Sequence, residues 1–386
     1  MQIRQIEIRN FRNYLSQSIH FQARVNLFLG DNGQGKTNLL EAIYLLTKGV
    51  SFRPGKTETF IHHNSRESMG ALKGALLSAT IQKESLESQV KISLSRESKS
   101  YLINGKRSSA QALVQNFPSI LFSPESLGAI KEGPEARRQL IDEAMTALNV
   151  NASHVAQAYS RCLRAKNRLL RDFKKGLYQE QGFKETLESL NSSFLPLACR
   201  LTQMRIAFIK DLVPDLQRSI QFIFSPKNVD ISVDYSISSQ SALEWEMEEI
   251  VQAQTSRLKD LQRSEIDSGV ALVGPHKHDL RFLFAGEDAR YFCSQGQQRA
   301  LILSVKMAQI MYHQRVHGVL PFLLLDDVLS ELDPEKRARL VAFLKQIKPQ
   351  IFLTSTDLSF PLDFDFGDKD VDIFQVKEGV AQRQTC

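Results

Sequence analysis

The sequence predicts a mixed α/β fold interrupted by a long helical segment, and three observations support this prediction. The glycine-rich stretch Gly30–Thr37 lies between a short apolar run and a helical pattern over 38–46. A second apolar run, Pro321–Leu325, ends in two carboxylates. Between them, from about Glu135 to Leu261, apolar residues recur mainly at helical spacings of three and four. The helical segment is therefore expected to be an insertion.

The composition is that of a folded globular protein. Of 386 residues, 42% are hydrophobic and 24% are charged, which argues against long disordered regions. The longest dense apolar run, 319–325, contains a proline and is far shorter than the roughly 20 residues that cross a membrane. The first residues alternate polar and apolar side chains and lack a secretion signal. We therefore expect a cytoplasmic protein.

Charge, cysteine and histidine usage restrict the partners only slightly. The net charge of +6 permits an anionic partner without requiring one. The four cysteines contain no C-x-x-C pair, so neither a disulfide framework nor a zinc site is indicated. His276 and His278 are spaced like metal ligands, but no third ligand lies nearby in the sequence. A histidine metal site is therefore disfavoured.

The stretch Gly30–Thr37 matches the phosphate-loop pattern, in which two glycines flank four residues and Lys and Thr follow. Its glycines let backbone N–H groups turn toward phosphate oxygens, and the next helix adds its positive N-terminal end. Lys36 would reach the β- and γ-phosphates, and the Thr37 hydroxyl would hold Mg²⁺. A purely structural turn is the alternative. The nucleotide contacts predicted here are Gly30, Asp31, Asn32, Gly33, Gln34, Gly35, Lys36, Thr37 and Asn38.

Short elements surround this loop in the sequence. Apolar residues in 3–8 predict an opening strand. Residues 71–104 alternate in short runs that predict an antiparallel sheet, with a hairpin turn at Asn104-Gly105. Arg53 lies between helix breakers, where it would either reach a bound nucleotide or face solvent.

The inserted segment predicts an antiparallel helical arm. Apolar residues recur over 156–177 and over 187–208, and the 176–182 stretch predicts the turn between two helices. Pro196 is expected to kink the second helix. A basic stripe at the same period either contacts DNA or forms a solvated face. This basic stripe consists of Arg161, Arg164, Arg168, Arg171 and Lys175.

Three segments in the last quarter of the chain suit a phosphate loop. Cys293–Arg299 precedes a helical run and offers small residues and free N–H groups to a phosphate. The second apolar run ends in Asp326 and Asp327, as a Mg²⁺-side acid and a water-orienting base require. Ser330–Pro334 follows directly, and Ile351–Asp357 predicts a further strand that ends in polar residues.

Together these segments resemble the ABC-type ATPases and, within them, the SMC-like head domains. The resemblance covers nearly the whole chain. Its motifs are Asn10–Asn13, Gly30–Thr37, Ser51–Arg53, Phe122–Glu125, Gly274–Lys277, Ser294–Gln297, Asp326-Asp327 and Ser330–Asp333. It implies that Ser294–Gln297 is the signature motif, that Asp326 closes the Walker B strand, and that Asp333 belongs to a loop crossing a dimer interface.

The resemblance also implies ATP and Mg²⁺ as cofactors. The implied site residues are Thr37 and Asp326 as metal ligands, Asp327 and Lys36 as catalytic residues, and Arg12, Asn13, Arg53, Ser294, Gly296 and Gln297 as further nucleotide contacts. Asp327 stands where most ABC members have Glu, so we expect slow hydrolysis by a shorter carboxylate. Thr354–Thr356 replaces the usual switch His, and the usual Gln of the lobe-linking loop is not evident near 122–126. Those two roles remain unassigned.

By this resemblance we expect an ATP-dependent DNA-binding protein of recombinational repair, replication restart and SOS induction. It would bind single-stranded or gapped DNA, form a homodimer driven by ATP, hydrolyse ATP weakly with DNA stimulation, and act with other repair proteins. The alternatives are a nucleotide-binding subunit of a membrane transporter and an ATP-gated clamp in which hydrolysis only resets binding. The expected domains are 1–134 (first part of the ATPase lobe), 135–265 (helical lobe and arm) and 266–386 (C-terminal part of the ATPase).

Overall fold

The computed structural model describes residues 1–53, 55–62, 74–225, 229–356 and 370–384. These residues form two compact units. Unit 1 consists of Met1–Leu127 and Arg299–Cys386, and unit 2 is the continuous segment Gly128–Gln298. The three domains expected from the sequence divide the chain at other positions than these two units do, and that division stays a prediction.

Unit 1 contains an antiparallel sheet with the strand order β2-β1-β4-β5-β6-β7. Its strands are β1 (Gln2–Phe11), β2 (Tyr14–His20), β4 (Gly74–Lys83), β5 (Leu86–Ser95), β6 (Lys99–Ile103) and β7 (Lys106–Arg107). Asn104 and Gly105 have positive φ angles of 50° and 74° and join β6 to β7. The predicted opening strand, antiparallel sheet and hairpin turn are confirmed, although 71–73 lie outside the described residues.

A second sheet of unit 1 has the order β16-β15-β3-β14-β13-β8. Its strands are β3 (Val25–Leu29), β8 (Ser119–Phe122), β13 (Phe322–Asp326), β14 (Ile351–Ser355), β15 (Val371–Lys377) and β16 (Val380–Arg383). All neighbouring pairs are parallel except β15 with β16. Because β3, β13 and β14 are parallel and wholly buried, polar residues that follow them meet at one edge of the sheet.

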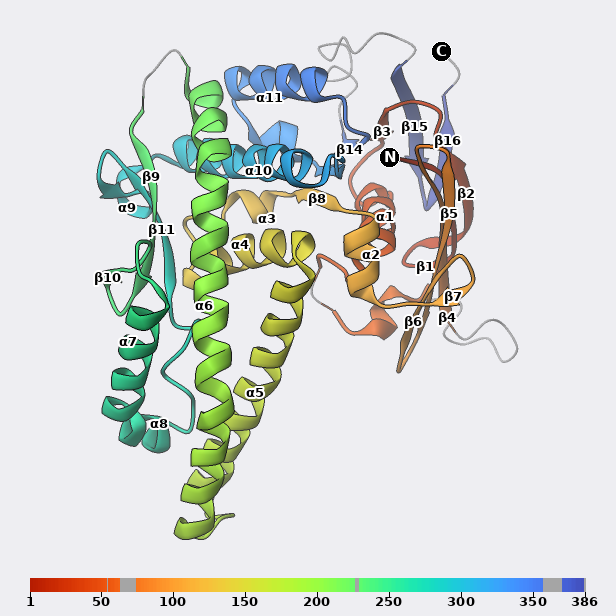
Figure 1. Cartoon of the computed structure of the whole chain (residues 1–386). Coiled ribbons are helices and arrows are strands. Elements are labelled where there is room, and N and C mark those ends of the chain that lie inside the picture. Colours follow the sequence, from red (N-terminus) through yellow and green to blue (C-terminus); the bar gives the residue numbers. More distant parts are fainter. Residues whose placement is uncertain (54, 63–73, 226–228, 357–369, 385–386) are drawn as a thin grey trace. The chain divides into compact units, whose positions relative to one another are not determined.

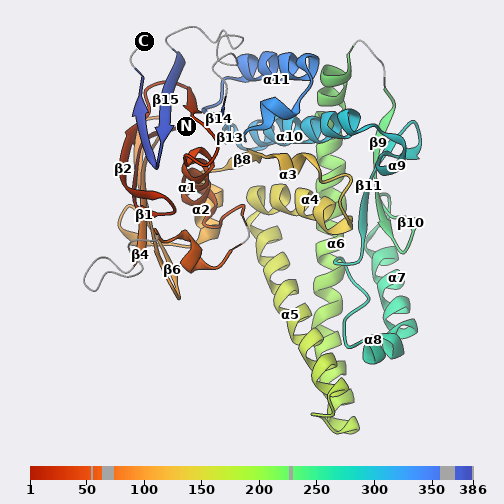
Figure 2. The ribbon, with the colours of Figure 1, turned by 180° about the vertical axis from the view of Figure 1, so that it is seen from behind.

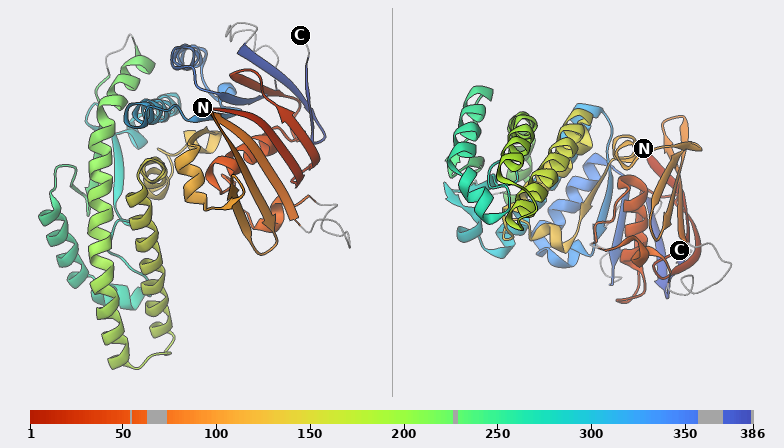
Figure 3. Two further views of the ribbon diagram at one scale, coloured as in Figure 1. Left: turned by 45° about the vertical axis from the view of Figure 1, so that its right-hand side comes forward. Right: turned by 90° about the horizontal axis from the view of Figure 1, so that it is seen from below.

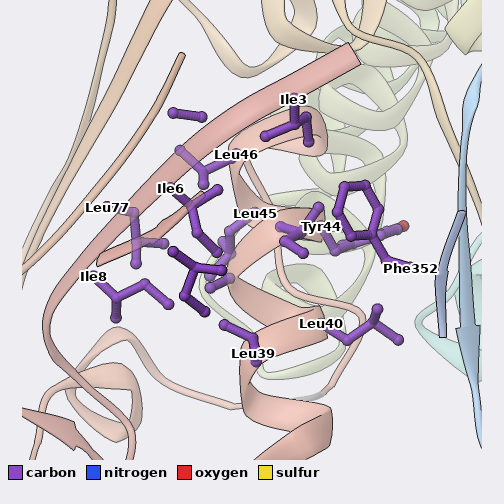
Figure 4. Packing of buried hydrophobic residues seen from close by; sticks show 14 of the residues in the cluster. Ile3, Ile6, Ile8, Leu39, Leu40, Tyr44, Leu45, Leu46, Leu77 and Phe352 are labelled. Carbon is purple, nitrogen blue, oxygen red and sulfur yellow. The ribbon is translucent and has the colours of Figure 1, made fainter. Parts of the chain in front are cut away.

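Helix α1 (Lys36–Lys48) packs between the two sheets of unit 1, where its buried side chains form the core. Strands of the antiparallel sheet lie side by side over this helix (Figure 3). Figure 4 shows Ile6 and Ile8 of β1 beside Leu39 and Leu45 of α1, with Phe352 of β14 in the same cluster. Burying each such side chain contributes about 1.5–3 kcal/mol, so the core fixes the helix that follows the phosphate loop.

Shorter elements complete unit 1. They are η1 (Thr57–Phe60), α2 (Ala110–Asn116), α3 (Pro124–Leu127), η3 (Val328–Glu331) and α11 (Pro334–Ile347). Helix α10 (Gln295–His317) begins in unit 2 and continues in unit 1. Asp333 caps α11, because its Oδ1 accepts a hydrogen bond of 2.9 Å from the Lys336 backbone N–H.

Unit 2 is built around two long helices, α5 (Val150–Lys174) and α6 (Glu180–Phe224), which run side by side as an antiparallel arm (Figures 1 and 2). The predicted arm is confirmed. Its turn is shorter than predicted, because α6 already begins at Glu180 and includes Gly182. Helix α6 also continues across Pro196. The other helices are α4 (Pro134–Leu148), α7 (Met247–Asp260), α8 (Gln262–Ser268) and α9 (Ala289–Phe292).

Unit 2 also contains a four-stranded sheet of order β10-β9-β11-β12. Its strands are β9 (Ile231–Ile237), β10 (Gln240–Ser241), β11 (Asp279–Phe284) and β12 (Glu287–Asp288). The sequence predicted mainly helical patterns over 135–261 and did not predict β9 and β10 there. The alternation of Ile231, Val233 and Tyr235 with polar residues is a strand signal that the surrounding helical periodicity obscured.

Buried polar side chains fix the loop that precedes β11. Arg205 of α6 donates to both carboxylate oxygens of Asp142 at 2.8 Å and to the Pro275 carbonyl oxygen at 2.6 Å. His276 lies between the Tyr159 hydroxyl, at 2.6 Å, and the Ala271 carbonyl, at 3.0 Å. Burial lowers the pKa of His276 to about 4, so its role here is a neutral structural one.

Two classes of feature are absent from the described ranges. No helix there is long and apolar enough to cross a membrane. Over the same ranges, no group of three or more His, Cys, Asp or Glu side chains is arranged to hold a metal ion. His278, the second histidine of the disfavoured metal site, is instead hydrogen-bonded through Nδ1 to the Tyr235 hydroxyl at 2.9 Å.

Candidate functional site

The glycines of the phosphate loop occupy backbone conformations that other residues rarely adopt. Gly30, Gly33 and Gly35 have φ angles of 153°, 83° and 113°. A Cβ on Gly30 would lie 2.3 Å from the Val376 carbonyl oxygen, and one on Gly35 would lie 2.5 Å from Asn13 Nδ2. Glycine is therefore required at both positions, while Gly33 has nothing within 4 Å and faces open space.

Lys36 closes the loop on itself. Its Nζ donates hydrogen bonds to the carbonyl oxygens of Gly30, at 2.6 Å, and Asp31, at 2.9 Å. Burial lowers the pKa of Lys36, while the carboxylates of Asp327, Asp31 and Asp326 oppose that shift. The ammonium group is thus held at the mouth of the loop, as a phosphate-binding lysine requires.

Asp326 accepts hydrogen bonds from two threonines. The hydroxyls of Thr37, at the start of α1, and Thr354, on β14, each donate to Oδ1 of Asp326 at 2.9 Å. The Asp327 backbone N–H in turn donates to Thr354 Oγ1 at 2.9 Å. Burial raises the pKa of Asp326, and the two hydroxyl hydrogen bonds oppose the shift. A hydroxyl oxygen beside a carboxylate is the ligand set that Mg²⁺ prefers, so these residues fit the ion.

Asp327 follows the end of β13 in a left-handed backbone conformation, with φ of 51°. Such a conformation is rare outside glycine and is concentrated at functional sites. Ser330 donates to the Asp327 carbonyl oxygen at 2.7 Å and steadies the turn. Asp327 is half-buried and acts electrostatically on Lys36. The structure therefore brings both predicted catalytic residues to one place.

The remaining predicted contacts of unit 1 form a hydrogen-bond chain beside the loop. Asn13 Nδ2 donates to the Gln34 carbonyl oxygen at 3.0 Å, and Asn38 Nδ2 donates to Asn13 Oδ1 at 2.8 Å. Arg53 Nη1 then donates to Asn38 Oδ1 at 2.8 Å. Arg53 therefore points to the start of α1. This placement favours contact with a bound nucleotide over a solvent-facing position. Arg12 joins the same cluster through another residue, Glu41.

Ser294, Gly296 and Gln297 belong to unit 2, whereas the phosphate loop belongs to unit 1. The Ser294 N–H donates to Gln297 Oε1 at 2.8 Å, and the Gln297 N–H donates to Ser294 Oγ at 3.3 Å. This reciprocal pattern is a capping box at the start of α10. A Cβ on Gly296 would meet nothing within 4 Å, so the helix start is open to close approach.

Sequence reasoning missed two groups that support the loop. Glu41 is an acidic residue within an apolar helical run, and a charge in such a place is itself a signal. The second group is the turn between β15 and β16. The Glu378 N–H donates to Gln34 Oε1 at 2.8 Å, and the Gly379 N–H donates to the Gln34 carbonyl at 3.0 Å. The Glu378-Gly379 pair signals a turn, but nothing in the sequence says that it contacts the loop.

Comparison with known proteins identifies the class that this fold and site define. The model of the RecF/RecN/SMC N terminal domain family matches residues 2–382. The Smc head domain of Pyrococcus furiosus shares the fold, with a TM-score of 0.52 at 16% identity over 100% of this chain and 96% of that one.

The similarity is greater to one branch of that family. The DNA replication and repair protein RecF of Geobacter sulfurreducens is 33% identical over 93% of this chain and 94% of its own length. RecF of Halothermothrix orenii is 31% identical over 99% of both chains. A solved structure described as the recombination mediator protein RecF-ATP in the RecFOR pathway has a TM-score of 0.84 and 27% identity, covering 99% of this chain and 97% of that chain. The chain therefore belongs to the RecF family, and the transporter-subunit alternative has no support in these comparisons.

We predict that Gly379→Ala loosens the phosphate loop. A Cβ there would lie 2.1 Å from the Asn13 carbonyl oxygen, so the turn must shift and weaken its two hydrogen bonds to Gln34. Amide hydrogen exchange at residues 30–37 should accelerate roughly tenfold, since each bond contributes about 0.5–1.5 kcal/mol. Gly286→Ala is the matched control, because Gly286 also has positive φ but nothing within 4 Å. Equal exchange in both variants would contradict the prediction.

Proposed function

We propose that this protein binds ATP and, in its ATP-bound form, binds single-stranded or gapped DNA in recombinational repair, replication restart and SOS induction. Family membership supports the general role, since the relatives are named DNA replication and repair proteins and one solved relative is described as RecF-ATP. The observation that carries the nucleotide part is the hydrogen bond between Thr37 and Asp326 beside a loop closed by Lys36.

We assign a role to each predicted site residue of unit 1. Backbone N–H groups of the loop and the Lys36 ammonium bind phosphate oxygens, with Asn13, Asn38, Arg12 and Arg53 along one side. Thr37 and Asp326 hold Mg²⁺, which supplies positive charge against the phosphates when bound. Asp327 orients the attacking water. Because Asp327 has a shorter side chain than Glu, turnover is slow. Stimulation of this weak ATPase activity by DNA is proposed from the family resemblance alone.

We further propose that ATP joins two copies of the chain. Ser294–Gln297 would bind the nucleotide held by the partner's phosphate loop, as the open, capped start of α10 allows. A nucleotide between two subunits stabilises the dimer by mass action. Asp333 would lie at the same interface. By the family resemblance, RecR-like and RecO-like proteins are the proposed protein partners.

Replacing Lys36 with Ala tests the nucleotide site. A charge-assisted contact to phosphate contributes about 1.5–3 kcal/mol, so affinity for ATP should fall roughly 10- to 150-fold. ATP-driven association with gapped DNA should be lost with it. Titration with fluorescent ATP and with labelled gapped DNA measures both effects. Unchanged affinity for ATP would show that Gly30–Thr37 is only a structural turn.

The basic stripe provides a test of DNA binding. The structure exposes Arg161, Arg164, Arg168 and Arg171 of α5, and within the described residues only Arg168 has an ion pair, 3.6 Å from Asp172. Changing Arg164, Arg168 and Arg171 to Gln should weaken binding at all sequences. The slope of the salt dependence should flatten by about 0.9 for each duplex phosphate that an arginine no longer neutralises. Affinity for ATP should not change. An unaltered salt slope would identify the stripe as a solvated face.

Ser294→Arg tests the dimer. A bulky cation at the start of α10 should block close approach of a partner while leaving each subunit's own phosphate loop intact. Analytical ultracentrifugation with Mg-ATP should show a wild-type dimer and a mutant monomer at equal protein concentration. If the wild type stays monomeric, or if both proteins dimerise equally, Ser294–Gln297 is an ordinary helix cap.

A further inference from the structure

Glu41 is a charged residue in the most apolar part of unit 1. It lies on α1, one turn after Thr37, and its neighbours Leu39, Leu40 and Ala42 belong to the core. Its side chain is 0% exposed. A buried carboxylate persists only where partners compensate for its lost hydration. The identity of those partners therefore shows what Glu41 does.

Two arginines and one serine hold the Glu41 carboxylate. Arg12 binds it in a bidentate manner, with Nε donating to Oε2 at 2.9 Å and Nη2 donating to Oε1 at 2.8 Å. Ser51 Oγ donates to Oε1 at 2.5 Å, and Arg53 Nη1 lies 3.9 Å from Oε2. One carboxylate thus joins the turn after β1, helix α1 and the segment that follows α1.

The backbone and side chain of Arg12 are further fixed from 59–60. Arg12 has a φ angle of 54°, a conformation that costs free energy in any residue with a Cβ. Its N–H donates to the Phe60 carbonyl at 2.8 Å, and Nη1 donates to the Thr59 carbonyl at 3.0 Å. Its guanidinium also lies 4.8 Å from the centre of the Phe60 ring. Arg12 is therefore immobilised in a strained conformation, as functional arginines often are.

Both arginines keep N–H groups for a further ligand. A guanidinium has five N–H donors. Contacts within the described part of the chain use three of them in Arg12 and one in Arg53. The side chains of Arg12 and Arg53 are 18% and 39% exposed, so both side chains are partly accessible to solvent. Two cations that share one carboxylate would repel each other without it.

We infer that Glu41 is a positioning residue that holds Arg12 and Arg53 with their free donors directed at the phosphates of the bound nucleotide. This inference rests on the proposed nucleotide site and assigns to it a residue that does not itself touch the ligand. Through Arg53 and Asn38, the same carboxylate is linked to the first turn of α1, where Thr37 lies. Its removal leaves the arginines mobile, so they bind phosphate at a greater entropic cost.

Titration of a non-hydrolysable ATP analogue with Mg²⁺ tests this inference, because it measures affinity without turnover. Glu41→Gln should weaken binding about tenfold or more, since it removes the charge from the hydrogen bonds with Arg12 and from the ion pair with Arg53. Glu41→Asp keeps the negative charge, but its side chain is one methylene shorter and cannot make the same bidentate contact with Arg12. We therefore expect an affinity between those of the wild type and Glu41→Gln. Asp372→Asn is the matched control. Asp372 is also buried and ion-paired in unit 1, but it binds the N–H groups of Gln22 and Ala23, before β3 and far along that strand from the loop.

The decisive comparison is Glu41→Gln in a background of Arg12→Ala and Arg53→Ala. There the substitution should change affinity for the analogue less than about twofold, because the residues through which Glu41 acts are gone. It should also raise the melting temperature of that background by removing an unpaired buried charge. An equal loss of affinity in both backgrounds would overturn the positioning role.

The remaining outcomes separate this inference from the proposed function. If the wild type does not bind the analogue, the proposed function fails. If the wild type binds and the double arginine variant is weakened, but Glu41→Gln binds like Asp372→Asn, only the positioning role fails. Should Glu41→Gln not fold, Glu41→Asp supports the same comparison, since wild-type affinity in that variant would contradict the bidentate requirement.

Discussion

One carboxylate oxygen, Oδ1 of Asp326, determines the geometry of the site, because hydroxyls from two different elements converge on it. Strand β13 is not adjacent to β3, since β14 lies between them. The parallel register sets Asp326 beside Thr354, and Thr354 beside Phe28 near the end of β3. The distance between the phosphate loop and the acidic end of β13 is therefore fixed by two strand pairings, β3 with β14 and β14 with β13, rather than by loop conformations.

The site contains two buried carboxylates in opposite electrostatic settings. Asp326 is bound by neutral hydroxyls, so it keeps negative charge available for a cation. Glu41 is bound by Arg12 with Arg53 nearby, so that cluster carries net positive charge suited to an anion. Helix α1 carries Thr37 and Glu41 one turn apart and thereby joins the two settings. A nucleotide complexed with a divalent cation presents a positive metal ion and negative phosphates to a protein. Helix α1 sets the distance between the residues that suit the cation and the arginines that suit the phosphates.

The site residues that could be predicted from the sequence are those that lie within a recognisable local motif. Lys36, Thr37 and Asp326 were predictable because a glycine turn, a helix start and an apolar strand are each recognisable from neighbours in the chain. Thr354 was placed only within the segment that replaces the switch His, with no role assigned, since its hydrogen bond to Asp326 depends on strand order. Strands β9 and β10 were missed among helical patterns, and the contact of Glu378 with Gln34 joins residues 344 positions apart. Such contacts depend on tertiary packing, which local periodicity does not encode.

The contact of the β15–β16 turn with Gln34 has a consequence for folding during synthesis on the ribosome. Unit 2 is continuous from Gly128 to Gln298 and has its own sheet and helices, so it can fold as soon as that stretch has emerged. Unit 1 cannot, because its phosphate loop is braced by residues 378 and 379. During translation the chain therefore passes through a stage in which the arm is complete while the loop is unbraced. The phosphate loop therefore becomes competent to bind a ligand only after residues 378 and 379 have been synthesised.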